Sequence, residues 1–537
     1  MSEPTATQLK DEGNELFRKQ DYVGALAKYT EAIALDDKSA VLYANRAACN
    51  HGLNRNLDAV DDAKMATVID PGYAKGWSRL AASRDALADW ERSAEAWQKA
   101  LDALPKTNLS PAEQRQKDQY SAGLDAAQAR GKVPRDPHFI RFKAGDGNLP
   151  WQIATGMLPE LRQAGPEKYS SSAWVISHAY EDFTKGVGFM NELKSVPHSQ
   201  APGGIAYGGS LMALTYLTNG LTRDERAFCF NQPDWITKNH TDQGSVTFEA
   251  TARRAWHSDG PETIKELAQK RLKEKGWNDV RPALSVTVRA WIMRSMLESH
   301  LKEGPAVGLQ FLTRAVDLLE WGRNVWKNVA NEDRGKIFQD TFLRSVRSMH
   351  LKMFMDAYVT DPGLNSKFPL EHLKEEAEDL LKEIDIASKS PSKEEVDPGF
   401  VSSFCIYPAG IAHSMIGFYH AQTARYSDDL FACIGFANGA KDYMQAAKTY
   451  SEDDEYRAFY LCCAMDCMRN AGVSIRDFNK VAIELRGAVP KMMKIWAVSA
   501  LQQGGRDDKI QANLRIADDL MKLVAEGKLT MEDPVPL

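Results

Sequence analysis

One pattern, present three times, decides the fold of the first hundred residues. The three copies read ATQLKDEGNELFRKQDYVGALAKYTEAIALDDKS (6–39), AVLYANRAACNHGLNRNLDAVDDAKMATVIDPGY (40–73) and AKGWSRLAASRDALADWERSAEAWQKALDALPKT (74–107). Small, large apolar and terminal residues recur at fixed places in the copies: Ala25, Ala59 and Ser93; Ala32, Ala66 and Ala100; Leu9, Tyr43 and Trp77; Asp37, Pro71 and Pro105. Small residues suit the contact between two helices, large apolar residues fill the gaps between hairpins, and proline ends a helix. The pattern therefore predicts three stacked pairs of antiparallel helices.

This pattern resembles the tetratricopeptide repeat (TPR) family, whose repeat has the same length of 34 residues. The departures are mild: Asn50 and Arg84 stand where an aromatic residue is usual, and Asp37 replaces proline. After the third repeat, the sequence Ser-Pro-Ala-Glu (110–113) has the residues of a helix start with a capping box. A solenoid needs a capping element, and residues 111–130 are predicted to be that cap helix.

The chain is predicted to be all-α, with a TPR domain at residues 1–130 and a larger, mainly helical domain at residues 138–537. The Gly- and Pro-containing stretch 131–137 is predicted to link them. Helical periodicity is clear beyond residue 280, and helical hairpins are one possible arrangement there. A short strand is expected near residues 246–251. The carboxy-terminal domain resembles no family that its residues identify.

The first helices of the repeats carry five polar residues at regular spacing. Lys10 and Asn14 are four apart, as are Lys75 and Arg79, so each pair shares a helical face. Asn45 lies 34 residues before Arg79, at the equivalent position of the second repeat. Cationic groups and amide NH groups together suit the two carboxylates of an acidic carboxy-terminal residue. Taken singly, each charge would be explained as a solvated helix face.

Three stretches resemble the carboxylate-clamp subset of the TPR family: LKDEGN (9–14), LYANR (42–46) and AKGWSR (74–79). That resemblance implies binding of the Glu-Glu-Val-Asp tails of cytosolic heat-shock chaperones of the seventy- and ninety-kilodalton classes. The expected function is that of an adaptor or co-chaperone whose carboxy-terminal domain binds a client or second partner. The alternatives are an enzyme with an unrecognised catalytic domain tethered to chaperones, or a scaffold for a partner that is not a chaperone.

Composition argues against several other classes of protein. A net charge of −6 argues against non-specific binding to nucleic acid. The first eight residues contain no secretory signal, so the cytoplasm is the expected compartment, with the nucleus as an alternative. Two stretches with few charges, 199–222 and 398–424, contain proline, glycine or histidine and are expected to form buried core rather than membrane spans.

No catalytic, cofactor or metal-binding motif stands out. Cys462, Cys463 and Cys467 are expected to be buried thiols, and the pair His413 and His420, which has no carboxylate neighbour in sequence, is expected to lie in the core. The only catalytic or metal-site candidates are two His-x-Asp triplets, at 240–242 and 257–259.

The chaperone-tail sequence itself occurs inside the chain, as Glu394-Glu395-Val396-Asp397. It precedes Pro398 and lacks a terminal carboxylate, so coincidence in a charged loop is the favoured interpretation. An internal pseudo-ligand that autoinhibits the binding site is the alternative.

Overall fold

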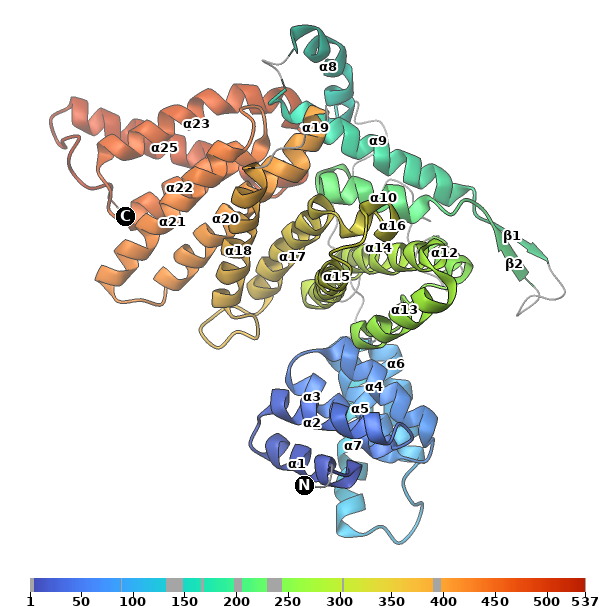
Figure 1. Cartoon of the computed structure of the whole chain (residues 1–537). Helices are drawn as coiled ribbons and strands as arrows, with labels where there is room; N and C mark the ends of the chain where they lie inside the picture. Colours follow the sequence, from blue (N-terminus) through green and yellow to red (C-terminus); the bar gives the residue numbers. More distant parts are fainter. Residues whose placement is uncertain are drawn as a thin grey trace. The chain divides into compact units, whose positions relative to one another are not determined.

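The computed structural model describes residues 4–87, 89–131, 148–165, 169–197, 205–228, 244–301, 304–389 and 397–536. These residues form helices and one two-stranded sheet (Figure 1). The chain divides into two compact units. Unit 1 comprises Met1–His138, Ser258–Leu267 and Ser295–Arg314, and unit 2 comprises Phe139–His257, Ala268–Arg294 and Ala315–Leu537.

Unit 1 begins with three helix pairs. They are α1 (Ala6–Arg18) with α2 (Tyr22–Leu35), α3 (Ala40–Gly52) with α4 (Asn56–Ile69), and α5 (Ala74–Ala86) with α6 (Trp90–Asp102). Helices α1, α3 and α5 begin at the first residues of the three sequence repeats. The predicted TPR-type solenoid is confirmed.

The small residues of the repeats do what the pattern requires. All six of those aligned above are fully buried: Ala25, Ala32, Ala59, Ala66, Ser93 and Ala100. Gly13 belongs to the same class of close contact, because a Cβ atom there would lie 2.8 Å from Cε1 of Tyr29. The ring of Tyr29 therefore packs directly on the backbone of α1.

The capping helix α7 (Pro111–Gly131) follows and packs on α6. Its amino terminus carries the predicted capping box. The backbone NH of Ser110 donates to Glu113 Oε2 (2.8 Å), and the backbone NH of Glu113 donates to Ser110 Oγ (3.3 Å). Apart from Gly131, the predicted linker 131–137 lies outside the described residues.

Unit 1 also includes parts of two later helices, α13 (Pro261–Lys275) and α15 (Pro305–Val325). Arg314 of α15 donates to Asp58 Oδ1 and Asp61 Oδ2 of α4, each at 2.7 Å from Nη2. Gln310 Oε1 accepts from the backbone NH of Leu57 (3.0 Å). Burial raises the pKa of Asp61, and the Arg314 guanidinium opposes that rise. The second repeat is thus bonded to residues that the sequence assigns to the carboxy-terminal domain.

Unit 2 is mainly helical. Its longer helices are α8 (Pro150–Ala164), α9 (Ser172–Asn191), α10 (Ala213–Arg223), α12 (Ser245–Arg253), α17 (Asp340–Thr360), α18 (Leu370–Ser388), α20 (Tyr407–Ala424), α21 (Asp429–Thr449), α22 (Glu455–Asn470), α23 (Ile475–Trp496) and α25 (Arg506–Ala525), and α14 (Trp277–Leu301) lies partly in this unit. Short elements join them: η3 (Glu225–Ala227), α16 (Asn331–Arg334), η4 (Lys336–Phe338), α19 (Pro398–Val401), η5 (Ser402–Ile406) and α24 (Ala500–Gln503).

Two features of unit 2 differ from the sequence expectation. The strand expected near 246–251 is wrong, because these residues lie in α12, where Val246, Glu249 and Ala250 form one buried face at helical spacing. An unexpected antiparallel hairpin joins β1 (Lys194–Pro197) to β2 (Ile205–Gly208), with Lys194 opposite Gly208.

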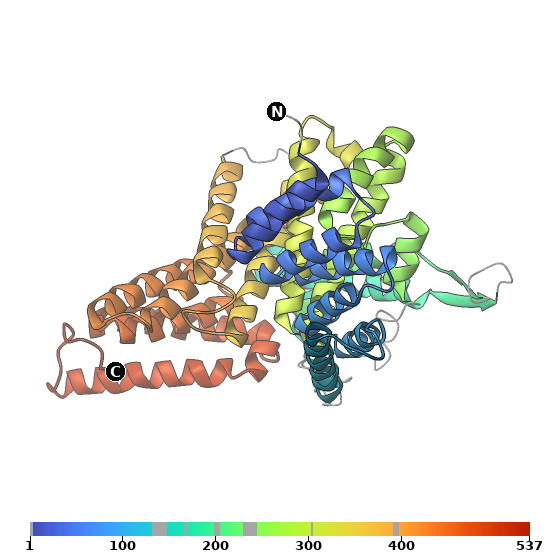
Figure 2. The ribbon, with the colours of Figure 1, turned by 90° about the horizontal axis from the view of Figure 1, so that it is seen from below.

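The helices α20, α21 and α22 lie side by side in Figures 1 and 2, and α25, red in Figure 2, packs on α22 and α23. Within the described residues, one helical stretch, 398–424, is long and apolar enough to cross a membrane. Of its most apolar window, 67% is buried inside the protein, which agrees with the expected core role.

Candidate peptide-binding site

The five predicted clamp residues lie on the first helix of each pair: Lys10 and Asn14 on α1, Asn45 on α3, and Lys75 and Arg79 on α5. The structure joins the two asparagines directly. Asn45 Nδ2 donates a hydrogen bond to Asn14 Oδ1 at 3.2 Å, which links α1 to α3. Helix α3 in turn packs on α5.

Asn14 has a second partner, which lies on α2. Tyr29 Oη donates to the same Asn14 Oδ1 at 2.8 Å. Burial raises the pKa of Tyr29 to about 12, so the hydroxyl stays protonated near neutral pH. Because Oδ1 of Asn14 accepts two hydrogen bonds, the NH₂ group is the part of this amide left to donate to a ligand.

The three cations differ in their surroundings. Lys10 is partly buried, and its Nζ lies 3.8 Å from Oδ1 of the exposed Asp11, a contact that water screens. Lys75 and Arg79 are exposed, and no carboxylate of the described residues lies within ion-pair distance of either. Burial raises the pKa of the Cys49 thiol to about 12, and the nearby Arg79 opposes this. Since Cys49 is one helical turn after Asn45, Arg79 lies beside α3.

A buried ion pair holds α3 against α4 next to this site. Arg46 donates to both oxygens of Asp62, with Nε 3.0 Å from Oδ2 and Nη2 2.7 Å from Oδ1. Asn50 Nδ2 adds a hydrogen bond to Asp62 Oδ2 at 2.9 Å. This pair fixes the helix that carries Asn45. Neither it nor the Tyr29 hydroxyl was anticipated from the sequence, although Arg46 directly follows Asn45.

The histidines of α20 have a carboxylate neighbour that the sequence did not indicate. Asp442 of α21 lies with Oδ1 4.0 Å from His413 Nδ1 and Oδ2 3.7 Å from His420 Nε2. Burial lowers the pKa of both histidines and raises the pKa of Asp442 to about 6. Among the described residues, no group of three or more His, Cys, Asp or Glu side chains is arranged to hold a metal ion.

The cysteines of α22 are thiols held by burial. Burial raises the pKa of Cys463 to about 11 and that of Cys467 to about 12. Such thiols are largely protonated at neutral pH and are weak nucleophiles. This agrees with the prediction of buried, unreactive cysteines.

The remaining sequence candidates have local roles or lie outside the described residues. The triplet 240–242 lies outside them, and so does 394–396. The backbone carbonyl of His257 accepts from Trp291 Nε1 (3.0 Å). Asp397 caps α19 by accepting from the backbone NH of Phe400 (2.9 Å), and its Oδ1 lies 3.0 Å from His178 Nδ1.

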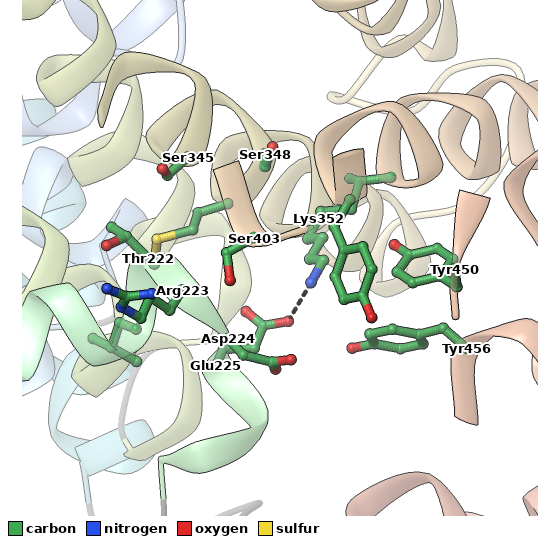
Figure 3. A pocket seen from close by; sticks show the side chains of 14 residues that line it. Thr222, Arg223, Asp224, Glu225, Ser345, Ser348, Lys352, Ser403, Tyr450 and Tyr456 are labelled. Atoms are coloured by element: carbon green, nitrogen blue, oxygen red, sulfur yellow. Dashed lines mark hydrogen bonds and ion pairs between the residues drawn. The ribbon is translucent and has the colours of Figure 1, made fainter. Parts of the chain in front are cut away.

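Unit 2 contains a polar cavity of about 40 Å³, lined by residues of α10, η3, α17, α20 and α22 among others (Figure 3). Lys352 Nζ donates to Glu225 Oε1 at 2.8 Å on its wall. Sites for organic ligands usually measure roughly 300–1,000 Å³. The space in this cavity suits a few water molecules rather than a substrate.

Beside this cavity, Arg226 joins three segments of unit 2. Its guanidinium donates to Asp224 (Nη2 to Oδ2, 2.6 Å) and to Asp454 (Nη1 to Oδ1, 2.8 Å). It also lies between two aromatic rings, 4.1 Å from the ring centroid of Tyr456 and 4.0 Å from that of Trp496. Burial alone would raise the pKa of Asp224, but Arg226 outweighs it and the pKa is lowered.

The three helix pairs, their buried small residues and the cap helix define a TPR domain in unit 1. No protein-family model matches the chain. The amino-terminal residues are similar to TPR-containing co-chaperones. A heat-shock cognate co-chaperone, sgt12 of Aspergillus fumigatus, is 36% identical over 100 residues, which are 19% of this chain and 29% of that protein.

Two further relatives match a similar length of chain. The small glutamine-rich TPR-containing protein 2 of Saccharomyces cerevisiae is 43% identical over 97 residues (18% of this chain, 28% of that protein). The heat shock protein sti1 homolog of Schizosaccharomyces pombe is 40% identical over 96 residues (18% and 16%). The chain thus spans less than a third of the length of each of these three relatives.

Solved TPR domains match the same region. The Sgt2 TPR domain of Aspergillus fumigatus is 30% identical, with 26% of this chain and 92% of that chain covered and a TM-score of 0.21. The first TPR domain of Spaghetti (RPAP3), solved with the HSP90 peptide SRMEEVD, is 27% identical, with 22% and 94% covered and a TM-score of 0.20.

Proposed function

We propose that the TPR domain binds the acidic carboxy-terminal tails of cytosolic heat-shock chaperones, of the EEVD type, and that the chain is a chaperone adaptor. The observation that carries this proposal is the hydrogen-bonded pair Asn14 and Asn45, on helices that also carry or adjoin Lys10 and Arg79. The names of the relatives, which include a co-chaperone and heat shock proteins, support it.

The chemistry of the site suits this ligand. A peptide that ends in aspartate presents two carboxylates on one residue, and Lys75 and Arg79 are exposed cations with no carboxylate of the described residues in ion-pair contact. The Asn14 amide supplies a directional donor beside them. A charge-assisted hydrogen bond contributes about 1.5–3 kcal/mol and less where water screens it, so removal of one cation should weaken binding about tenfold or more.

Unit 2 is proposed to bind a client or a second protein partner. Its polar cavity is too small for an organic substrate, whereas the start of α21 exposes Leu430, Phe431 and Ile434, each more than half accessible to solvent. Exposed apolar residues grouped in this way are typical of protein contact sites. A partner of cytosolic chaperones would work in the cytoplasm, which is the compartment expected from the sequence.

The test is titration of the full chain against a labelled peptide that ends in MEEVD, followed by fluorescence polarisation. Separate Lys10→Ala, Lys75→Ala and Arg79→Ala variants should each bind at least about tenfold more weakly. The matched control is Lys106→Ala, which removes an exposed lysine of unit 1 that pairs with Asp102 (3.4 Å) instead.

A second control is the same peptide with a carboxy-terminal amide, which removes one carboxylate and should bind weakly to the unmodified protein. Unchanged affinity in both Lys75→Ala and Arg79→Ala, with the melting temperature retained, would refute the clamp.

A further inference from the structure

The amide of Asn14 has two orientations, related by a flip of 180°, and only one of them suits an acidic ligand. With its NH₂ group outward it donates to a carboxylate, and with its oxygen outward it repels one. In the structure Oδ1 faces inward, where it accepts from Tyr29 Oη at 2.8 Å and from Asn45 Nδ2 at 3.2 Å.

The two asparagines alone would not fix this orientation. If both amides flipped together, Asn14 Nδ2 would donate to Asn45 Oδ1, and the bond between them would survive with its direction reversed. The hydroxyl of Tyr29 breaks this symmetry, because a buried O–H group requires an acceptor. Asn14 Oδ1 is the acceptor that it meets among the described residues, and a flip would replace that oxygen with a donor.

On this geometry, and resting on the proposed function, we propose that Tyr29 is a positioning residue of the peptide-binding site, whose hydroxyl holds the Asn14 amide with its NH₂ group toward the peptide carboxylate.

The neighbouring sequence builds this contact. Gly13 directly precedes Asn14, and its lack of a side chain lets the Tyr29 ring lie against α1, where a Cβ atom would meet Cε1 at 2.8 Å. The ring is only 1% exposed. Its position is thus set by packing, independently of any ligand, and the hydroxyl is directed before a peptide arrives.

The experiment is a double-mutant cycle on the full chain with the MEEVD peptide. Tyr29→Phe keeps the ring and removes the hydroxyl, and it should weaken binding about three- to tenfold. In an Asn14→Ala background the same substitution should change affinity less than about twofold, because no amide remains to be oriented. A purely structural role of the hydroxyl would instead give the same loss in both backgrounds.

Tyr22→Phe is the matched control. Tyr22 belongs to the same helix and packs on Phe17 (ring centroids 5.3 Å apart), so its variant should bind as the unmodified protein does. Equal losses in both backgrounds, or no loss in Tyr29→Phe, would overturn the positioning role. If Lys75→Ala and Arg79→Ala weaken binding in that same series, the clamp stands without it. A lack of binding by the unmodified protein would overturn the clamp itself, and the positioning role with it.

Discussion

Replacement of Arg226 by methionine should destabilise unit 2 more than any exposed ion pair could. The side chain of Arg226 is 7% exposed, and those of its partners Asp224 and Asp454 are 6% and 0% exposed. Methionine fills a similar volume but leaves both carboxylates without their cation. Removal of one partner from a buried ion pair costs about 3–5 kcal/mol, because the remaining charge stays buried.

The aromatic contacts of Arg226 add to this cost. Its guanidinium lies between Tyr456 and Trp496, and each such contact contributes about 0.5–2 kcal/mol, although the contributions of groups that touch are not additive. Arg226→Lys keeps the charge but loses the planar fork, so it should lie between the unmodified protein and Arg226→Met. Together these values predict a loss of about 4 kcal/mol for the methionine variant.

The assay is urea denaturation of the full chain, followed by circular dichroism and tryptophan fluorescence, with the transition of unit 2 analysed separately because two units need not unfold together. The matched control is Arg486→Met. Arg486 pairs with Asp518 at 2.7 Å, but both side chains are more than half exposed, so its loss should cost less than about 1 kcal/mol. Equal, small losses in Arg226→Met and Arg486→Met would refute the reasoning.

The pH dependence gives a second check on Arg226. In the unmodified protein the pKa of Asp224 is lowered, so its contribution to stability is present above the unfolded-state pKa and is lost as the pH falls. Without Arg226, burial would raise the pKa values of Asp224 and Asp454 above their unfolded values. The difference in stability between Arg226→Met and the unmodified protein should therefore shrink between pH 7 and pH 4.

Two further predictions concern single carboxylates. Burial raises the pKa of Glu249 to about 7, against the opposing bond from the backbone NH of Leu214, so its contribution is full below about pH 4.3 and is lost as the pH rises through 7. Glu249→Gln should remove up to about 3 kcal/mol of this fall, which thermal melts at pH 5 and pH 8 would measure, and an unchanged pH profile would contradict it. Asp397→Ala should leave affinity for the MEEVD peptide within about twofold and cost about 1 kcal/mol of stability, since Asp397 caps α19. A clear rise in affinity would instead support the pseudo-ligand interpretation.

The repeats were predictable because their information is local. A helix pair needs small residues at its contact, and a period of 34 writes those positions three times, down to the first residues of α1, α3 and α5. The spacing of four between Lys10 and Asn14 likewise indicates a shared face without knowledge of the fold.

The hydrogen bonds of the site were not predictable in the same way. Tyr29 fits the repeat pattern as a large residue of the second helix, and nothing in that pattern says where a hydroxyl points. Asp442 escaped notice because it approaches His413 and His420 from the neighbouring helix. The segment 246–251 is rich in β-branched residues, which favour strands, and its helical state follows from burial of one face of α12.

The contact of Arg314 with Asp58 lies furthest from any local signal, since the two residues are 256 positions apart. It has a consequence for the order of events during synthesis on the ribosome. When residue 131 has been made, all seven amino-terminal helices exist, but Asp58 and Asp61 must wait for almost two hundred further residues before their cation is available. The nascent TPR domain therefore passes through a stage in which this acidic edge of α4 is open to water, and it is completed only by a segment translated after much of unit 2.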